Sequence, residues 1–430
     1  MRVNLAADIC NLVEWLVVSS RGLWRWVIAA LSAALLLAPL AASAEVVLSG
    51  FMQQNTAFNT AGQNPDGRHY KWLEERAQIK LDATGDAWRL LVKGDLAYDH
   101  LGRQDESELR EGYIDYVGGN WDLRLGRQII TWGLGDLVFV NDFFPKDHEA
   151  LFAGRPLEYL KRGVDAVKLG AYPEFASFEL VLAPNFRESR ISDANRFRLY
   201  DPMPAVVNRE TVKPGQGDIG LRAYRDVAGY DAALYWYRGF QRTPSMRPDN
   251  MAATTKITYF YPRLSVYGAS LSGRAGEGVL SLEAAYYDSH DDRAGNDFAV
   301  PNSQTRLLAG YQIQPAEDTS LGFQYYAEAM HDYGAYRVAL PTNFPIDKRW
   351  SHTVTARLTQ LFLHQTLRLS AYASYNASNG DHFVNPELRY SFTDKVWGAI
   401  GANFFGGKPW GSFGQLSRDD NVYLQVRYEF

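Results

Sequence analysis

The chain has 430 residues with 44 basic and 49 acidic side chains, so its formal net charge of −5 does not suit a nucleic-acid-binding protein. Its single cysteine, Cys10, cannot form a disulfide within the chain. No stretch after residue 44 reaches the roughly 18 apolar residues of a membrane-spanning helix. A mature chain that enters a membrane would therefore need a closed β-barrel, the other fold that satisfies its backbone groups in lipid.

Residues 1–44 have the features of a secretory signal. Two arginines precede the apolar stretch WVIAALSAALLLAPLAA, and the segment ends on the small residues Ala-Ser-Ala that signal peptidase cuts. A membrane anchor is the alternative, but the apolar core contains Pro39 and is not followed by a cluster of charge. We predict that residues 1–44 are removed together with Cys10, which leaves residues 45–430 as one domain without a thiol for catalysis, metal binding or lipidation.

Segments that alternate polar and apolar residues recur along residues 45–430, and each predicts a strand with one apolar and one polar face. Short turns and long connections alternate between them, which is typical of barrels with short periplasmic turns and long outer loops. The sequence therefore predicts an all-β fold, a transmembrane antiparallel β-barrel of eighteen strands, with sixteen as the alternative if weak segments are misread. The predicted strands are 46–58, 70–83, 87–100, 107–118, 121–131, 164–172, 176–184, 217–226, 229–241, 254–273, 277–289, 304–314, 318–331, 349–362, 366–376, 383–392, 395–404 and 421–430.

The last strand, NVYLQVRYEF, ends the chain on Phe430. A soluble sandwich strand could show the same alternation. However, an even number of strands returns the C-terminus to the periplasm, and the 26 tyrosines and 11 tryptophans can supply the aromatic girdles of a membrane barrel. The terminal run resembles the C-terminal signature of Gram-negative outer-membrane barrels. We interpret Phe430 as an assembly signal for the barrel-assembly machinery and expect the protein in the outer membrane of a Gram-negative bacterium.

The residues on the polar face of each predicted strand should line a water-filled lumen, and they include both acidic and basic side chains. Arginines on predicted strands near the C-terminus should form one basic wall, which closure brings beside basic residues of strands 2 and 3. Such guanidinium groups suit carboxylate or phosphate. The alternative is a structural ladder in which each arginine pairs with a carboxylate such as Glu387. The predicted pore-lining residues are Arg76, Arg89, Arg124, Arg357, Arg368, Arg389 and Arg427.

The longest early connection, from residue 132 to residue 163, is rich in glycine and aromatic side chains. Glycine permits sharp reversals, and so many aromatics do not suit a loop in solvent. We predict that this connection folds back into the barrel and narrows it. The predicted constriction residues, including the strand end that leads into the loop, are Arg127, Gln128, Trp132, Asp136, Asp142 and Asp147.

The same region carries a resemblance. The run Gly126-Arg127-Gln128, then Trp132-Gly133 and a later Pro-x-Asp element at Pro145, resembles the GRQxxxWG signature of a proteobacterial family of outer-membrane, porin-like β-barrels known as a domain of unknown function. The similarity covers residues 107–172. The shorter run Gly126-Arg127-Gln128 also resembles, more distantly, a G-R-Q run of alginate-export and phosphate-selective porins. The resemblance implies a barrel that handles small compounds, hydrophobic ones or lipids included.

Three functions follow from these patterns. The leading hypothesis is a porin-like channel for small solutes, with anions favoured by the basic wall; the alternatives are a channel for hydrophobic compounds or lipids, and an outer-membrane hydrolase, for which the scattered histidines offer no nucleophile beside a base. The sequence contains no cofactor or metal motif and no C-x-x-C-H for haem. Expected partners are outer-membrane lipid, lipopolysaccharide and a small-molecule solute. The acidic stretch SHDDRAGND could hold a bridging cation, but a solvated loop is the favoured interpretation. The oligomeric state stays open.

Overall fold

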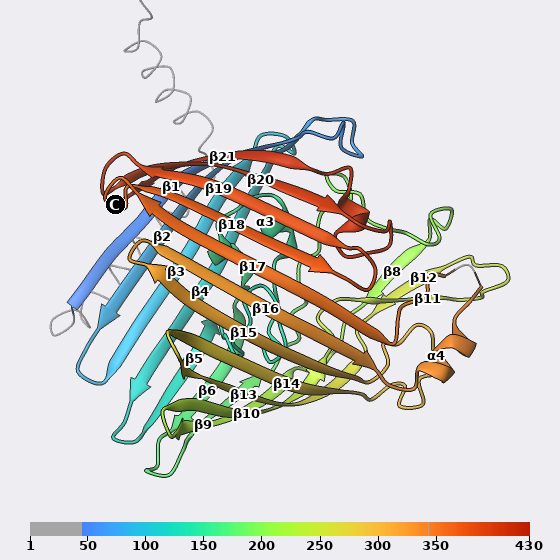
Figure 1. Cartoon of the computed structure of the whole chain (residues 1–430), viewed down its shortest axis with the longest axis horizontal. Coiled ribbons are helices and arrows are strands. Elements are labelled where there is room, and N and C mark those ends of the chain that lie inside the picture. Colours follow the sequence, from blue (N-terminus) through green and yellow to red (C-terminus); the bar gives the residue numbers. More distant parts are fainter. Residues whose placement is uncertain (1–44, 343) are drawn as a thin grey trace, which may run out of the picture.

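The computed structural model describes residues 45–342 and 344–430, so the predicted signal segment lies outside the described residues. Within these ranges, one antiparallel sheet of eighteen strands closes on itself, because β1 pairs with both β2 and β21. Figure 1 shows the resulting barrel, with α4 and a small sheet beyond one end and the C-terminus at the other. No helix in the described ranges is long and apolar enough to cross a membrane.

The barrel strands have the following bounds: β1 Glu45–Asn59, β2 Tyr70–Thr84, β3 Trp88–Asp99, β4 Gln104–Val117, β5 Trp121–Gln128, β6 Val164–Ala171, β7 Ser177–Ala183, β9 Asp218–Val227, β10 Tyr230–Phe240, β13 Arg263–Ala275, β14 Gly278–Ser289, β15 Gln304–Ala316, β16 Thr319–Met330, β17 Trp350–Phe362, β18 Leu367–Asn376, β19 His382–Ser391, β20 Val396–Gly406 and β21 Asn421–Glu429. The short helices are α3 His148–Phe152, η2 Leu157–Leu160, α4 Tyr333–Ala339 and η3 Gly414–Leu416.

The prediction of eighteen strands is confirmed for the described residues, and the predicted ranges differ mostly at their ends. The predicted strand 254–273 is wrong in one respect, because it is broken at Tyr261 and Pro262. Its first part, β12 (Ile257–Phe260), leaves the barrel and joins β8 (Arg209–Val212) and β11 (Ser245–Pro248) in a three-stranded sheet. Proline lacks the N–H that a continuous ladder would need, so the barrel strand β13 begins only at Arg263.

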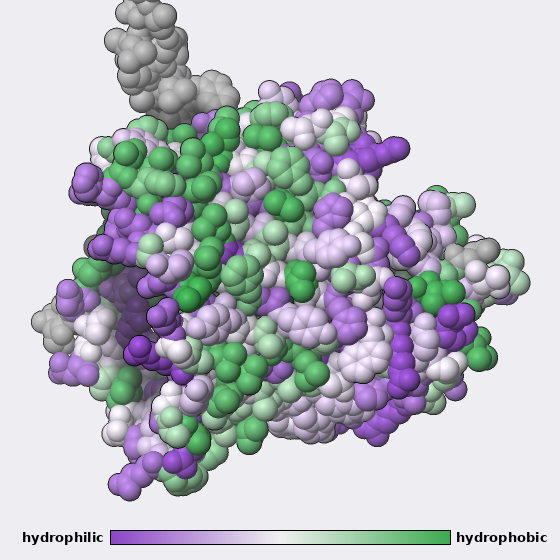
Figure 2. All heavy atoms as spheres, in the orientation of Figure 1, coloured by the Kyte–Doolittle hydropathy of each residue, from purple (hydrophilic) through white to green (hydrophobic). Residues whose placement is uncertain are grey.

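The two faces of the strands differ as the alternation predicted. On β21, Leu424 and Val426 are about half exposed, whereas Tyr423 and Gln425 are buried toward the interior. Figure 2 shows hydrophobic side chains spread over the strands of the barrel wall, with hydrophilic side chains gathered toward its two ends. The outer surface of the sheet therefore has the apolar character that a lipid-facing wall requires.

The seam between β1 and β21 includes the last residue of the chain. The backbone N–H of Phe430 donates to the carbonyl of Gly50 at 3.0 Å, and the Gly50 N–H donates to the Phe430 carbonyl at 3.0 Å. A Cβ atom at residue 50 would lie 2.9 Å from the Phe430 ring and 2.2 Å from the carbonyl oxygen of Gln78. Glycine at this position therefore permits the final ring to pack against the seam.

We expect Leu424→Arg to destabilise the folded barrel by about 2–4 kcal/mol, because it places a charge on the lipid face in the middle of β21. The measurement is the urea dependence of folding in lipid vesicles, with Leu424→Val as the apolar control. Equal unfolding midpoints for the arginine and valine variants would contradict a lipid-facing assignment of this residue.

Candidate functional site

The connection between β5 and β6, residues 129–163, contains α3 and η2. Its local structure follows from its sequence. Gly133 and Gly154 adopt φ angles of 82° and 71°, a region that favours glycine. Asp147 caps α3, because its carboxylate accepts a hydrogen bond from the backbone N–H of Ala150 at 2.9 Å. The glycines and the cap bend the connection into a compact unit.

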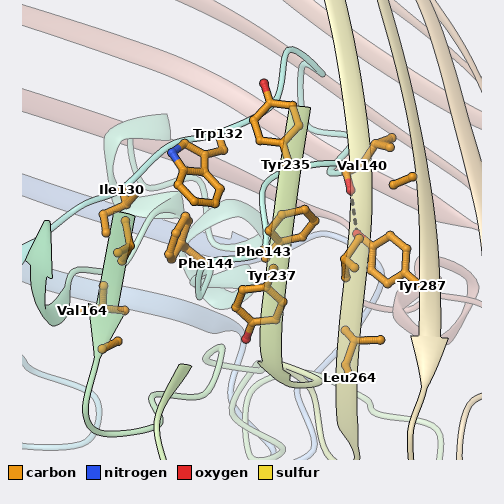
Figure 3. Packing of buried hydrophobic residues seen from close by; sticks show 14 of the residues in the cluster. Ile130, Trp132, Val140, Phe143, Phe144, Val164, Tyr235, Tyr237, Leu264 and Tyr287 are labelled. Atoms are coloured by element: carbon orange, nitrogen blue, oxygen red, sulfur yellow. Dashed lines mark hydrogen bonds between the residues drawn. The ribbon is translucent and has the colours of Figure 1, made fainter. Parts of the chain in front are cut away.

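Aromatic residues of connection 129–163 pack against the inner side chains of the wall. Trp132 is 3% exposed, and its ring lies 5.9 Å from that of Tyr235 on β10. Phe143 stacks on Tyr237 at 5.1 Å. Figure 3 shows these rings together, with the hydrogen bond that Tyr287 of β14 donates to the Val140 carbonyl. Their burial explains why the connection is so apolar.

Glu283 on β14 holds one end of connection 129–163. Its carboxylate accepts hydrogen bonds from the backbone N–H groups of Leu134, Gly135 and Asn141, and a further one from the Asn141 side-chain amide at 3.2 Å. Glu283 is itself 4% exposed. A buried carboxylate needs such donors, and here the connection supplies them in place of a cation.

Asp136 joins the same part of the connection to two further strands. Its backbone N–H donates to the Gln324 side chain of β16 at 3.2 Å. Its carboxylate accepts two hydrogen bonds from the Arg357 guanidinium of β17, one of them at 2.8 Å. The paired geometry is the strong, two-pronged form of an arginine–carboxylate contact.

The second half of the connection bonds to strands around the β1–β21 seam. The Phe152 carbonyl accepts hydrogen bonds from Asn403 of β20 at 3.0 Å and Asn421 of β21 at 3.1 Å. Arg155 forms a buried ion pair with Glu74 of β2 at 2.5 Å. Glu158 pairs with Arg427 of β21 at 2.8 Å. Side-chain bonds from one connection therefore reach strands that are far apart in the sheet order.

A cavity of about 420 Å³ lies between the second half of the connection and the wall. The four arginines predicted as one basic wall, Arg357, Arg368, Arg389 and Arg427, all line it, and Arg155 of the connection is a fifth. The carboxylates in its lining are Glu158 and Glu387. These four arginines come from β17, β18, β19 and β21, and positive charge exceeds negative charge among the lining residues.

The arginines of the cavity differ in their partners. Arg357, Arg368 and Arg427 pair with Asp136, Glu387 and Glu158, respectively. No carboxylate of the described ranges forms an ion pair with Arg389, whose guanidinium instead lies 3.9 Å from the centre of the Trp397 ring. Arg389 is therefore the lining cation with charge available for a solute.

The remaining predicted pore-lining arginines belong to structural pairs. Arg76 is 4% exposed and bonds to Glu74 at 3.0 Å and Asp95 at 2.9 Å. Arg89 binds Asp82 at 2.7 Å, and Arg124 binds both carboxylate oxygens of Asp115. These three arginines follow the alternative hypothesis, in which each inward arginine pairs with a carboxylate, so they do not extend the basic cavity.

The predicted constriction residues separate into two groups. Trp132 and Asp136 contact the wall directly, while Asp147 caps α3 and pairs with Arg190 at 3.2 Å, and Asp142 pairs with Lys146 at 2.9 Å. Arg127 and Gln128 instead end β5. Gln128 is fully buried, but Arg127 shares the outward phase of Leu125 and pairs with Asp165 at 2.7 Å, so its prediction as a constriction residue is wrong.

Sequence reasoning missed several residues that hold the connection. The sequence patterns assigned no role to Glu283, Gln425 or Arg155. Their partners are the backbone of Leu134, the Gly154 carbonyl and Glu74, all distant in sequence. Alternation along a strand gives the direction of a side chain but not the loop atom that it meets.

One serine–histidine contact bears on the hydrolase hypothesis. His290 Nε2 lies 2.8 Å from the Ser265 hydroxyl and 3.5 Å from the Asp288 carboxylate. Both neighbours meet the same ring nitrogen, whereas a nucleophilic triad needs the carboxylate on Nδ1 to orient the base. Ser265 is also only 2% exposed. This contact therefore lacks the geometry of an activated nucleophile.

No protein-family model matches the chain, and no curated protein is significantly similar to it in sequence. Solved structures share its fold. OccK2 of Pseudomonas aeruginosa in complex with glucuronate has 12% identity and a TM-score of 0.56, over 90% of this chain and 98% of that one. OccK3 of the same organism has 9% identity and a TM-score of 0.54, over 90% and 96%. The chain thus has the fold of porin-type outer-membrane barrels.

Glu149 on α3 is an ionisable group within the connection that is shielded from water. It is 8% exposed and accepts a hydrogen bond from the Asp193 backbone N–H at 2.5 Å. Burial raises the pKa of its carboxyl to about 7, against the opposing effect of Arg155, while Asp147 raises it further. The native state therefore keeps a proton that an unfolded segment releases near its ordinary pKa of 4.5.

We expect Glu149 to make the stability of α3 fall as the pH rises from about 4.5 to about 7, because its native carboxyl keeps a proton that the unfolded segment releases. Burial lowers the pKa of the neighbouring His148, which contributes in the opposite direction in both proteins. Glu149→Gln keeps an acceptor for Asp193 and removes the Glu149 contribution, so the stability of α3 relative to the wild type should increase from pH 5 to pH 8. The measurement is hydrogen exchange of amides 148–153 at pH 5 and pH 8, corrected for intrinsic rates. Glu174→Gln, in the exposed turn before β7, is the control and should behave as the wild type.

Proposed function

We propose that the protein is an outer-membrane, porin-like channel for small solutes, in which the arginine-lined cavity favours anions. The observation that carries the proposal is the cavity of about 420 Å³, with five lining arginines against two carboxylates. Barrels of sixteen to eighteen strands enclose an aqueous lumen, so a charged compartment within one can act on passing solutes.

Connection 129–163 is the element that narrows the lumen in this proposal. Its bonds to Glu283, Arg357 and Asn421 join strands on separate parts of the closed sheet. A segment held at these points crosses the lumen, so solutes would pass through the space that remains beside it. The resemblance of residues 107–172 to the porin-like family supports this role.

Arg389 is the residue most suited to contact an anion. A guanidinium without a carboxylate partner can offer two parallel N–H donors to a carboxylate or phosphate, and Trp397 fixes its plane. Arg368 and Arg427 line the same cavity but share their charge with Glu387 and Glu158. A carboxylate-bearing solute is the class that we favour, and glucuronate bound to the similarly folded OccK2 is a useful first probe.

A channel for hydrophobic compounds is less well supported by the contacts. The aromatic side chains that suggested it, among them Trp132 and Phe143, are buried against the wall. These side chains therefore hold the connection against the wall and do not line an open apolar passage. For assembly, we propose that the terminal strand and Phe430 engage the barrel-assembly machinery, because the final residue completes the β1–β21 seam.

Purified protein in a planar bilayer should give stable conductance steps, and a salt gradient should give a reversal potential that favours anions, because the cavity lining is net positive. A folded barrel that never conducts would contradict the channel proposal. Conductance with cation preference would retain the channel and contradict the role of the arginine cavity.

Arg389→Gln should lower the anion-to-cation permeability ratio roughly twofold or more, because it removes the unpaired charge of the cavity. Bilayer reversal potentials provide the measurement. The matched control is the double variant Arg124→Gln and Asp115→Asn, which removes an inward arginine together with its ion-pair partner and preserves the net charge. If both proteins lose selectivity equally, the cavity is not the selective site.

A further inference from the structure

A second hollow lies on the outside of the barrel. A groove of about 480 Å³ crosses β6, β7, β9, β10 and β13. Within it, Val167, Leu182, Ile219 and Arg238 are successive partners in the strand register and form one transverse row. The first three are apolar and Arg238 is charged, so one groove offers an apolar floor that leads to a cation.

Arg238 lies on the outward face of β10. Leu234 has the same phase and is 64% exposed, while Tyr235 and Tyr237 on the opposite phase are buried inside. Arg238 is exposed, and no residue in the described ranges forms an ion pair, side-chain hydrogen bond or ring contact with its guanidinium. It is therefore an unpaired cation on the face of the barrel that meets lipid.

The other ionisable groups at the rim of the groove have partners. Arg263 binds Asp291 at 2.6 Å, and His290 bonds to Ser265 at 2.8 Å. Asp218, which also contributes to the lining, pairs on the inner side with Arg242 at 2.9 Å. No carboxylate is thus available within the described groove to neutralise Arg238, and an anion from outside the chain can do so.

The position of Arg238 along β10 identifies the leaflet. A short turn connects β9 to the start of β10, whereas the strand end nearest Arg238 leads into the long connection 241–262. Long connections lie on the outer side of such barrels. A lipid-facing arginine costs about 2–4 kcal/mol at the bilayer midplane and about 0–1 near the interface, so this position suits the headgroup level of the outer leaflet.

We propose that this groove binds a phosphate-bearing lipid of the outer leaflet, with its phosphate on Arg238 and an acyl chain along Val167, Leu182 and Ile219. The guanidinium fork matches two phosphate oxygens, and the apolar row matches the hydrocarbon next to the headgroup. The proposal requires only that β10 faces lipid, so it does not depend on conduction through the lumen.

Native mass spectrometry of the full-length mature barrel in an uncharged detergent tests the site. The probe is diphosphoryl lipid A, compared with the same lipid after its phosphates have been removed. We expect one tightly bound lipid A on the wild type and about tenfold weaker binding by Arg238→Gln, with partial recovery in Arg238→Lys because it keeps the charge and loses the fork. Unchanged heat-modifiable migration on gels verifies that each variant is folded.

The matched control is Arg225→Gln. Arg225 lies on the outward face of neighbouring β9 at its opposite end, outside the groove, and its removal should leave lipid A binding unchanged. Equal binding by the wild type and Arg238→Gln would overturn the proposal. It would also be overturned if the phosphate-free lipid bound as well as lipid A, or if inorganic phosphate at low millimolar concentration displaced the lipid, because the site would then recognise only hydrocarbon or a soluble anion.

Discussion

The closure of β1 against β21 is the constraint on which the rest of the structure depends. A strand edge left open in hydrocarbon would expose a row of unpaired N–H and C=O groups, each of which costs several kcal/mol. The continuous register from Phe51–Glu429 to Asn59–Asn421 removes that edge. Closure also determines which residues become neighbours, because it places β21 beside β1 and β2 although almost the whole chain separates them.

The width that closure imposes makes the interior difficult to fill. Eighteen strands enclose more space than their own side chains occupy, so an inward aromatic such as Tyr235 or Tyr287 needs a further layer to pack against. Connection 129–163 supplies that layer with Trp132 and Phe143. Its charged anchors are equally dependent on their counterparts, because a buried ion such as Glu283 is stable only when its hydrogen-bonding capacity is met.

The barrel could be predicted from the sequence because each strand carries its own evidence. Alternation over ten residues reports the two faces of β21 without reference to any other strand. The break at Pro262 was missed because the apolar residues of β12 continue the pattern of β13, although the chain leaves the sheet between them. Arg127 was grouped with the constriction residues because it belongs to the glycine–arginine–glutamine motif, although its alternation with Leu125 on the same strand places it on the outward face.

The site was only partly predictable, for a different physical reason. Grouping Arg357, Arg368, Arg389 and Arg427 required strand order alone, and that order follows from the pairing of consecutive strands β17 to β21. Deciding which of them is paired required the position of the connection. Asp136 and Glu158 reach their arginines across more than two hundred residues of chain, and no local pattern encodes such contacts.

Asp136 pairs with the Arg357 guanidinium, so any external carboxylate would have to compete with a carboxylate that belongs to the protein itself. The carboxylate is tethered to the wall by the rest of the connection, so its effective concentration at the guanidinium is in the range of millimolar or above. A dilute external carboxylate cannot displace it, whereas the neighbouring Arg389 has no such tethered rival among the described residues. Arg389 would thus bind a carboxylate solute at a lower solute concentration than Arg357, although both side chains are arginines that line the same cavity.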